Sequence, residues 1–196
     1  MSYDADLIKE ELERLPTSFF ITKWILEHTP YIFDGYETEY IHWREEIASK
    51  LCIDATDIMI TGSASLGFSL SPYKNFKLFN EKSDIDVSII SHYYFDIAWH
   101  DLLYISRPII SPQMKEALDD HRQRLIYWGT IATDKILPLL SFGMEWDNII
   151  KESKMYPFLV DRDINFRIYK DKLSVRNYLT IGINKLKSKS LGEKTR

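Results

Sequence analysis

The chain has 196 residues, of which 45% are hydrophobic and 28% are charged, and its formal net charge is −4. This balance predicts an ordinary soluble protein with one sizeable core, and it argues against a protein that coats nucleic acid through its overall charge. The single cysteine excludes an internal disulfide framework and a multi-cysteine zinc site.

The sequence also indicates where the protein works. No apolar run approaches the roughly 20 residues that a membrane-spanning helix needs, and the N-terminus lacks the pattern of a cleaved signal. We therefore expect a cytoplasmic protein that does not bind a membrane. Cys52 follows an apolar helical pattern, so we expect a small core residue rather than a nucleophile.

Three helices are predicted at the start of the chain. Residues 4–15 place apolar side chains on one face, with Asp4 as the cap and Pro16 as the stop. The aromatic-rich segment 19–26 follows, and we expect it to form a core element or the contact with a partner protein or a second copy. The third helix covers residues 36–51, and its predicted inner face is Tyr40, Ile41, Ile47, Ala48 and Leu51.

The next segment contains two short predicted strands. Residues 58–61 are an apolar run that ends at Gly62-Ser63, and residues 84–90 are a second run. Alternate residues of a strand point to the same face, so Asp84 and Asp86 are expected to project together. Two carboxylates on one face are typical of a site for Mg²⁺ or Mn²⁺.

A polar spacer, residues 70–82, separates these strands. Its lysines are interleaved with aromatic side chains, which favours either contact with a nucleotide or nucleic acid or a surface loop held down by its aromatics. The residues concerned are Tyr73, Lys74, Phe76, Lys77, Phe79 and Lys82.

The rest of the chain is predicted to be mostly helical. Residues 93–150 show a helical pattern, in which His100 and His121 lack a partner at metal-ligand spacing and are interpreted as ordinary polar residues. Residues 161–169 alternate between apolar and polar side chains, which predicts a half-buried strand. A last helix is expected over 173–186, and a frayed basic terminus from Lys185 onward.

These elements predict an α+β fold. We expect an N-terminal helical segment, residues 1–52, packed on a core of residues 53–189 and followed by a basic tail, residues 190–196. From residue 151 onward the chain has twelve Lys or Arg against five Asp or Glu. This basic end is expected either to face phosphates or to be a solvated helix face.

The Gly62-Ser63 step has a chemical interpretation. Glycine allows the chain to turn sharply from a strand into a helix, whose first N–H groups are unpaired and attract phosphate. The Ser63 hydroxyl adds a donor. Arg167 could bind phosphate or the aspartates, or form a structural salt bridge, and Lys185 could reach a triphosphate or be solvated.

A Gly-Ser step after one strand and Ser83-Asp84-Ile85-Asp86 at the next resemble the signature of the DNA polymerase beta-like nucleotidyltransferase superfamily. The resemblance implies a mixed sheet with N-terminal and intervening helices. It also implies that Gly62 and Ser63 hold the triphosphate of a nucleoside triphosphate and that Asp84 and Asp86 bind the divalent metal. The spacer is longer than is usual in the superfamily, which predicts an inserted loop.

Members of this superfamily carry a third carboxylate on a later strand, where it orients the attacking hydroxyl. The strand 164–168 resembles that strand, but the acidic position is Asn165. An asparagine amide cannot take up a proton at neutral pH. Asp163 lies two residues earlier on the same polar face and could substitute for the missing acid.

Two functions follow from this resemblance. The first is a magnesium-dependent enzyme that transfers a nucleoside monophosphate to a hydroxyl of a protein, an RNA or a small molecule, with Asp84, Asp86 and either Asp163 or Asn165 as catalytic residues. Small members of the superfamily act in toxin-antitoxin and phage-defence systems, and the same context is expected here. The alternative is a nucleotide-binding or antitoxin protein that has lost turnover, which the Asn165 position favours.

Overall fold

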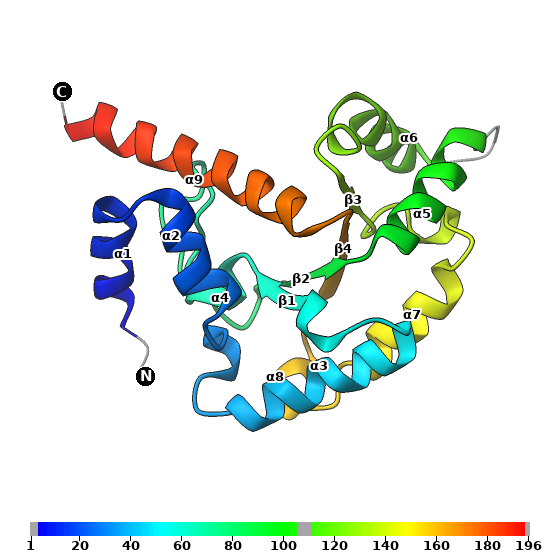
Figure 1. Ribbon diagram of the computed structural model, residues 1–196, viewed down its shortest axis with the longest axis horizontal. Coiled ribbons are helices and arrows are strands. Elements are labelled where there is room, and N and C mark those ends of the chain that lie inside the picture. The colour runs from blue at the N-terminus through cyan, green and yellow to red at the C-terminus, as the bar shows by residue number, and fades with distance from the viewer. Residues whose placement is uncertain (1–3, 106–110, 195–196) are drawn as a thin grey trace.

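The protein has an α+β fold in the computed structural model, which describes residues 4–105 and 111–194. The described residues include a central mixed sheet with strand order β1-β2-β4-β3 (Figure 1). β1 is antiparallel to β2, β2 is parallel to β4, and β3 is antiparallel to β4. The strands are β1 (Ile58–Thr61), β2 (Ile85–Ile90), β3 (Thr130–Ala132) and β4 (Ile164–Tyr169).

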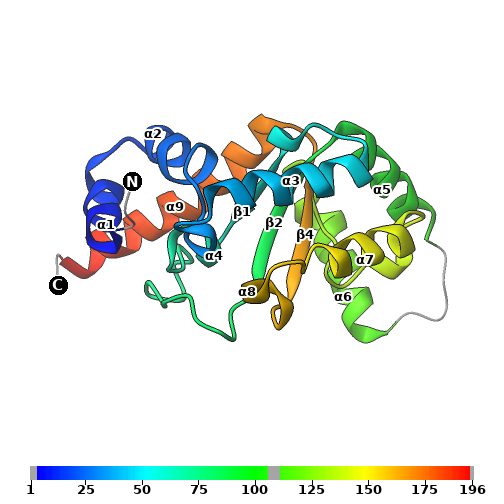
Figure 2. The same cartoon turned by 90° about the horizontal axis from the view of Figure 1, so that it is seen from below.

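One face of the sheet carries the main hydrophobic core. Alternate strand residues, such as Ile85, Val87 and Ile89 of β2, are fully buried there. Three helices, α3 (Glu37–Leu51), α5 (His92–Tyr104) and α7 (Gly143–Glu152), contribute to the same cluster. In Figure 2, α3 crosses in front of the strands and α7 lies beside β4, while α9 lies behind them. The predicted strands β1, β2 and β4 are therefore confirmed, with their apolar residues facing the core.

The other face is covered in part by the last helix. α9 (Lys172–Lys194) follows β4 directly, and its Val175 packs with Met59, Ile90 and Tyr169 of three strands. Tyr169, predicted to belong to a solvated polar face, is only 1% exposed. The predicted fraying from Lys185 onward is wrong as far as residue 194, because the helix continues; residues 195–196 lie outside the described part.

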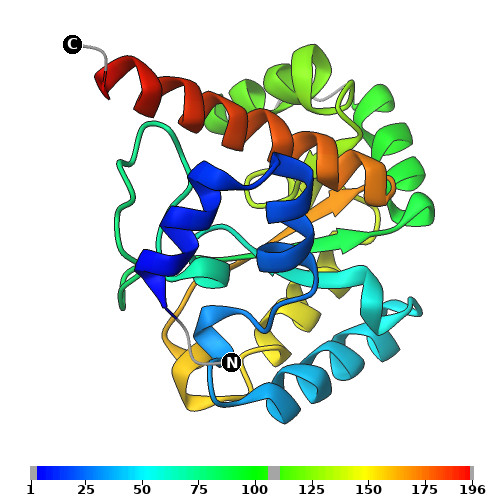
Figure 3. The ribbon, with the colours of Figure 1, turned by 60° about the vertical axis from the view of Figure 1, so that its left-hand side comes forward.

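The first helices pack against α9, and Leu26 also packs against strand residues of the sheet. α1 (Ala5–Arg14), α2 (Thr17–Ile21) and the π-helical turn η1 (Thr22–Leu26) form a second hydrophobic cluster with Ile183 and Leu186 of α9 (Figure 3). Asp4 caps α1 as predicted, accepting hydrogen bonds from the backbone N–H groups of residues 6 and 7. The cluster also contains Leu66 and Phe68, so it supports the turn that follows β1.

Two predictions about this architecture are wrong. β3 lies inside the region predicted to be helical throughout. Cys52 is exposed at the C-terminal end of α3, with φ of +52°, because the helix ends there in a left-handed turn. The remaining elements are η2 (Tyr31–Phe33), η3 (Ala55–Asp57), α4 (Ser63–Leu66), α6 (Pro112–Asp120), η4 (His121–Leu125), η5 (Leu137–Leu139) and α8 (Pro157–Val160).

None of the helices in the described ranges combines the length and the apolar character that crossing a membrane requires.

Candidate functional site

The turn after β1 lies directly against Asp86. Gly62 has φ of +68° and ψ of −151°, a conformation that is essentially restricted to glycine. A Cβ atom placed on Gly62 would lie 2.5 Å from Oδ2 of Asp86, closer than any real contact. Two features therefore favour glycine at position 62: its backbone angles, and the lack of a Cβ atom where the Asp86 carboxylate lies. The two parts of the predicted motif meet here.

Ser63 begins the helical segment that follows this turn. As predicted, the chain passes from strand through glycine into helix, but α4 has only four residues and ends at Gly67, where φ is +72°. Ser63 is partly buried. The segment is thus a single tight turn whose backbone is fixed by a glycine at each end.

The sheet register places the predicted polar residues in neighbouring positions. Asp86 pairs with Thr61 of β1 on one side and with Asn165 of β4 on the other. Register partners on adjacent strands share a face, so Asp86 and Asn165 project to the same side of the sheet. The hydrogen bond from the Ile85 N–H to the Asp163 carbonyl, 2.8 Å, extends the parallel pairing by one residue.

Asp84 and Asp163 directly precede Ile85 and Ile164, the first paired residues of β2 and β4. Both are exposed, as is Asp86, whereas Asn165 is partly buried. All four predicted catalytic residues are therefore brought to one corner of the sheet. Within the described ranges, however, no three Asp, Glu, His or Cys side chains are grouped closely enough to form a ready-made metal site.

Sequence reasoning missed one acidic residue at this corner, Asp134. Ala132 pairs with Arg167, and the N–H and hydroxyl of Thr133 both donate to the Phe166 carbonyl, at 3.2 and 2.6 Å. β3 ends at Ala132 and Asp134 lies in the turn that follows, close enough to Asp86 for its carboxylate to raise the pKa of Asp86. Residues 130–134 carry no alternation that the sequence could have used to find it, and they lie in a region interpreted as helical.

The charges around Asp86 act on its carboxyl group in opposite directions. Partial desolvation by the surrounding protein raises the pKa of Asp86, although the side chain remains exposed to water. The Arg167 guanidinium lowers this pKa, the Asp84 carboxylate raises it, Lys74 of the spacer lowers it and Asp134 raises it. Asp86 is thus the electrostatic centre of the corner, and the spacer contributes a positive charge to it.

Arg167 lies on the same face, two residues beyond Asn165. Its guanidinium carbon is 5.1 Å from the ring centroid of Tyr178 on α9, which holds it by a cation–π contact. Its Nη1 atom is buried without a hydrogen-bond partner among the described residues. Buried guanidinium nitrogens are normally satisfied, so Nη1 is a donor with capacity for a further acceptor. The predicted alternative, a structural salt bridge of Arg167, is not formed within the described residues.

Lys185 is the predicted site residue with the weakest connection to this corner. It is exposed on α9, where its neighbours bind the N-terminal helices: Thr17 donates to Asn184, and Lys187 donates to the Leu15 carbonyl. In the part of the chain that the structure describes, Lys185 has no hydrogen bond or ion pair with the other predicted site residues. Its role at a triphosphate stays a prediction.

Comparisons with known proteins add no assignment to this geometry. No family model, no curated protein and no solved structure matches the chain.

Proposed function

We propose that the protein is a magnesium-dependent nucleotidyltransferase that moves a nucleoside monophosphate from a nucleoside triphosphate to a hydroxyl group. The close approach of Gly62 to the Asp86 carboxylate is the observation that carries the proposal. In the superfamily that the sequence resembles, this turn and this carboxylate act together on the triphosphate. The acceptor is a protein, an RNA or a small molecule, and the chemistry of the corner is compatible with each.

The residues present fit a divalent metal ion. Mg²⁺ prefers oxygen ligands and is commonly bound by one or two carboxylates together with substrate phosphates and water. Asp86 of β2 and Asp84, which directly precedes β2, are two such carboxylates, and Mn²⁺ accepts the same ligands. When bound, the ion supplies positive charge that neutralises the phosphates of the nucleotide.

The side chains of the protein itself would bind the substrates and move the proton. The turn at Gly62 and Ser63 exposes donors for phosphate oxygens, and the unsatisfied Nη1 of Arg167 can donate to the same anion. Asn165 cannot accept the proton of the attacking hydroxyl. We propose that Asp134, whose charge acts on Asp86, takes that proton, with Asp163 as the other candidate.

Asn165 favours a second function. If Asp134 does not act as a base, the corner would bind metal and nucleotide without transferring the nucleotide. Such a protein would sense a nucleotide or neutralise a partner, and the toxin-antitoxin and phage-defence contexts expected from the sequence suit either function.

Transfer of label from α-³²P nucleoside triphosphates, measured with Mg²⁺ or Mn²⁺ and a candidate acceptor, separates the two functions. For the enzyme, Asp134→Asn should lower turnover by about a hundredfold or more, because general base catalysis contributes about 10²–10⁴. Asp86→Asn should also lower turnover strongly, because it removes a carboxylate ligand of the metal ion. The exposed Asp161, which precedes β4, provides the matched control Asp161→Asn, with turnover unchanged.

The second function predicts a different result in the same assay. The wild type would bind nucleotide and metal without transfer, and Asn165→Asp would restore turnover. If calorimetry detects neither metal nor nucleotide binding by the wild type, both functions are wrong.

A further inference from the structure

A separate cavity of about 530 Å³ lies at the opposite end of β4 from Asn165, where this strand passes into α9. Its walls come from α5, from the turn at residues 126–129 and from the first two turns of α9. Cavities of this volume are typical of small-molecule sites. None of the residues discussed at the Asp86 corner lines it.

The frame of this cavity is rigid. Gly129 has φ of +67°, and a Cβ atom there would collide with the Ser174 hydroxyl of α9. The Lys170 N–H donates to the Gly129 carbonyl at 2.9 Å, which fixes the turn to the end of β4. Asp171 accepts hydrogen bonds from the N–H and hydroxyl of Ser174, at 2.7 and 2.8 Å. The walls are thus held in place before any ligand binds, which lowers the cost of binding.

Aromatic side chains with exposed surface surround the cavity. Trp99 and Trp128 are 37% and 38% exposed, and Tyr127 is 82% exposed. Trp99 comes from α5, whereas the other two come from the turn, so residues far apart in sequence converge on one space. Two partly exposed indole rings at one preformed cavity favour a flat aromatic ligand such as a nucleobase, because base–aromatic stacking tolerates every base.

One cationic side chain, Lys170, lines the cavity together with the carboxylates of Asp96 and Asp171. The Lys170 ammonium lies 5.9 Å from the Phe95 ring centroid, and within the described residues it forms no salt bridge, so it is the group of the lining that can pair with a phosphate. The Asp171 carboxylate accepts the hydrogen bonds that cap α9. Asp96 and Asn177 line the same space and offer an acceptor and an amide for hydroxyl and amino groups.

We propose that this cavity binds a nucleoside 5′-monophosphate unit, with the base against Trp99 and Trp128 and the phosphate near Lys170. The unit is either a free mononucleotide or one residue of a single-stranded RNA, since both present the same base, sugar and phosphate. The proposal does not depend on the transferase activity of the Asp86 corner.

Calorimetric titration of the full chain with AMP, UMP and an eight-residue oligo(U), in EDTA, tests this site without a divalent metal at Asp84 and Asp86. Trp99→Ala and Trp128→Ala should each weaken binding by about five- to a hundredfold, the range found for loss of one stacked base. Tyr104→Ala is the matched control, because Tyr104 is 79% exposed on the same helix as Trp99 but outside the cavity.

A second pair of variants avoids any effect on folding. Leu173 is 65% exposed at the rim, so Leu173→Glu and Leu173→Lys should fold alike but differ in charge. Weaker binding with Glu and tighter binding with Lys supports an anionic ligand. Asp86→Asn should retain this binding even if it abolishes transfer, so failure of the proposed transferase function and failure of this site give different results.

The titrations also identify the source of the ligand. Binding of oligo(U) at least tenfold tighter than UMP, with strong salt dependence, identifies an RNA residue; equal or preferential binding of AMP or UMP identifies a free mononucleotide. The proposal is overturned if neither the mononucleotides nor oligo(U) bind the wild type, or if the tryptophan variants bind them as tightly as the wild type does. It is also overturned if the cavity binds the cation tetramethylammonium instead of these anionic ligands.

Discussion

At the scale of single residues, Gly62 links backbone conformation to the proposed chemistry. Its backbone angles cost other residues about 1–3 kcal/mol, and Asp86 occupies the space of a side chain. Gly62→Ala should therefore lower the free energy of unfolding by more than strain alone. Combining Gly62→Ala with Asp86→Ala should restore the part of the free energy of unfolding that the collision removes. Chemical denaturation of both variants measures the two contributions.

Two other glycines serve as controls for this series. Gly35 has φ of +78° with nothing within 4 Å of its Cβ position, so Gly35→Ala reports strain alone, about 1–2 kcal/mol. Gly182, inside α9, has open space and ordinary angles, so Gly182→Ala should stabilise the protein by about 0.5–1 kcal/mol. A Gly62→Ala variant no less stable than Gly35→Ala would contradict the close contact with Asp86.

Asp86 carries a second prediction, in which function and stability oppose each other. Its pKa is raised above the ordinary value of 3.8, chiefly by desolvation, so the folded state holds the proton more tightly than the unfolded state does. The stability contributed by this group is present below pH 3.8 and is lost as the pH rises through the folded pKa. The ionised Asp86 carboxylate therefore lowers the free energy of unfolding at neutral pH.

Asp86→Asn should consequently raise the melting temperature at pH 7 while it abolishes transfer, and the difference from the wild type should shrink toward pH 4. Melting curves at several pH values measure this. A variant less stable than the wild type at pH 7 would show instead that the carboxylate makes favourable contacts in the folded state.

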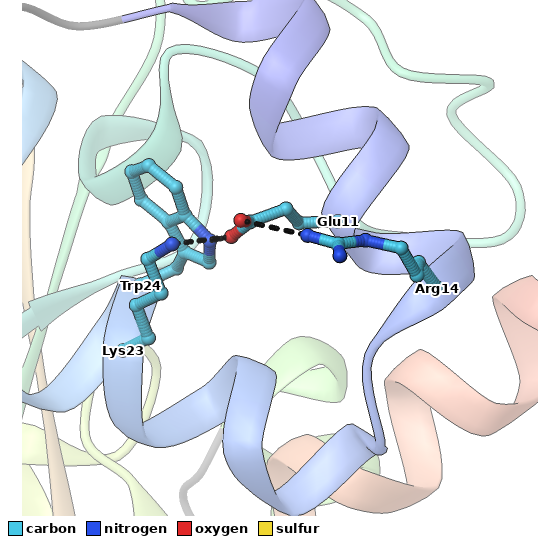
Figure 4. A network of polar contacts seen from close by, with 4 residues as sticks. All are labelled: Glu11, Arg14, Lys23 and Trp24. Atoms are coloured by element: carbon cyan, nitrogen blue, oxygen red, sulfur yellow. Dashed lines mark hydrogen bonds and ion pairs between the residues drawn. The ribbon is translucent and has the colours of Figure 1, made fainter.

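At the scale of elements, a buried carboxylate joins α1 to η1. Glu11 is 6% exposed, and it accepts hydrogen bonds from Lys23 at 2.6 Å, from Trp24 at 2.8 Å and from Arg14 at 3.3 Å (Figure 4). The hydrogen bonds from Lys23 and then Trp24 hold the pKa of Glu11 below its ordinary value of 4.5. This stabilisation is present above pH 4.5 and is lost as the pH falls through the lowered folded pKa.

Glu11→Gln should lower the melting temperature at pH 7 and reduce its fall in acid, since the group that takes up the proton is gone. Glu10→Gln, at the neighbouring exposed position, is the matched control and should leave both unchanged. Melting curves from pH 7 to pH 3 provide the comparison. Identical curves for the two variants would mean that the network does not hold α1 in place.

The elements also show which parts of the structure the sequence predicts and why. β2 and β4 were predictable because apolar and polar residues alternate along them, and so was the corner where Asp86 meets Asn165. The predicted inner face of α3 was partly wrong: Ile41 is 53% exposed, whereas Trp43 is fully buried. Trp43 donates its indole N–H to the Ser153 carbonyl at 2.9 Å, a contact between distant segments that local periodicity does not contain.

β3 could not be predicted because contacts distant in sequence hold it in place. Three residues give no usable periodicity, and the strand depends on pairing with β4 and on His121. The Ala132 N–H donates to Nε2 of His121 at 3.0 Å, and Nδ1 of His121 donates to the Ala117 carbonyl. Burial lowers the pKa of His121, in keeping with this neutral ring. Without β3 in the prediction, Asp134 could not be placed at the corner.

At the scale of the whole molecule, the described residues form two main hydrophobic clusters. One joins the sheet to α3, α5 and α7, and the other joins α1, α2, η1 and α9 to Leu66 and Phe68, beyond the turn at Gly62. The turn thus stands between the clusters: Asp86 belongs to a strand of the first, and α4 contributes Ala64 to the first and Leu66 to the second. The geometry of the corner therefore depends on how well both clusters are packed.

Amide hydrogen exchange on Ile183→Ala and Ile149→Ala tests this organisation. Ile183 is 2% exposed in the second cluster and Ile149 is 4% exposed in the first, and truncating either should cost about 2–5 kcal/mol. If the clusters open separately, Ile183→Ala should speed exchange at least about thirtyfold in residues 8–21 and 63–68, while β2 and β4 keep their protection. Ile149→Ala should produce the reverse pattern. Equal acceleration throughout both variants would mean that the chain unfolds as one cooperative unit, and the corner would then be no more sensitive to the N-terminal helices than to the rest of the core.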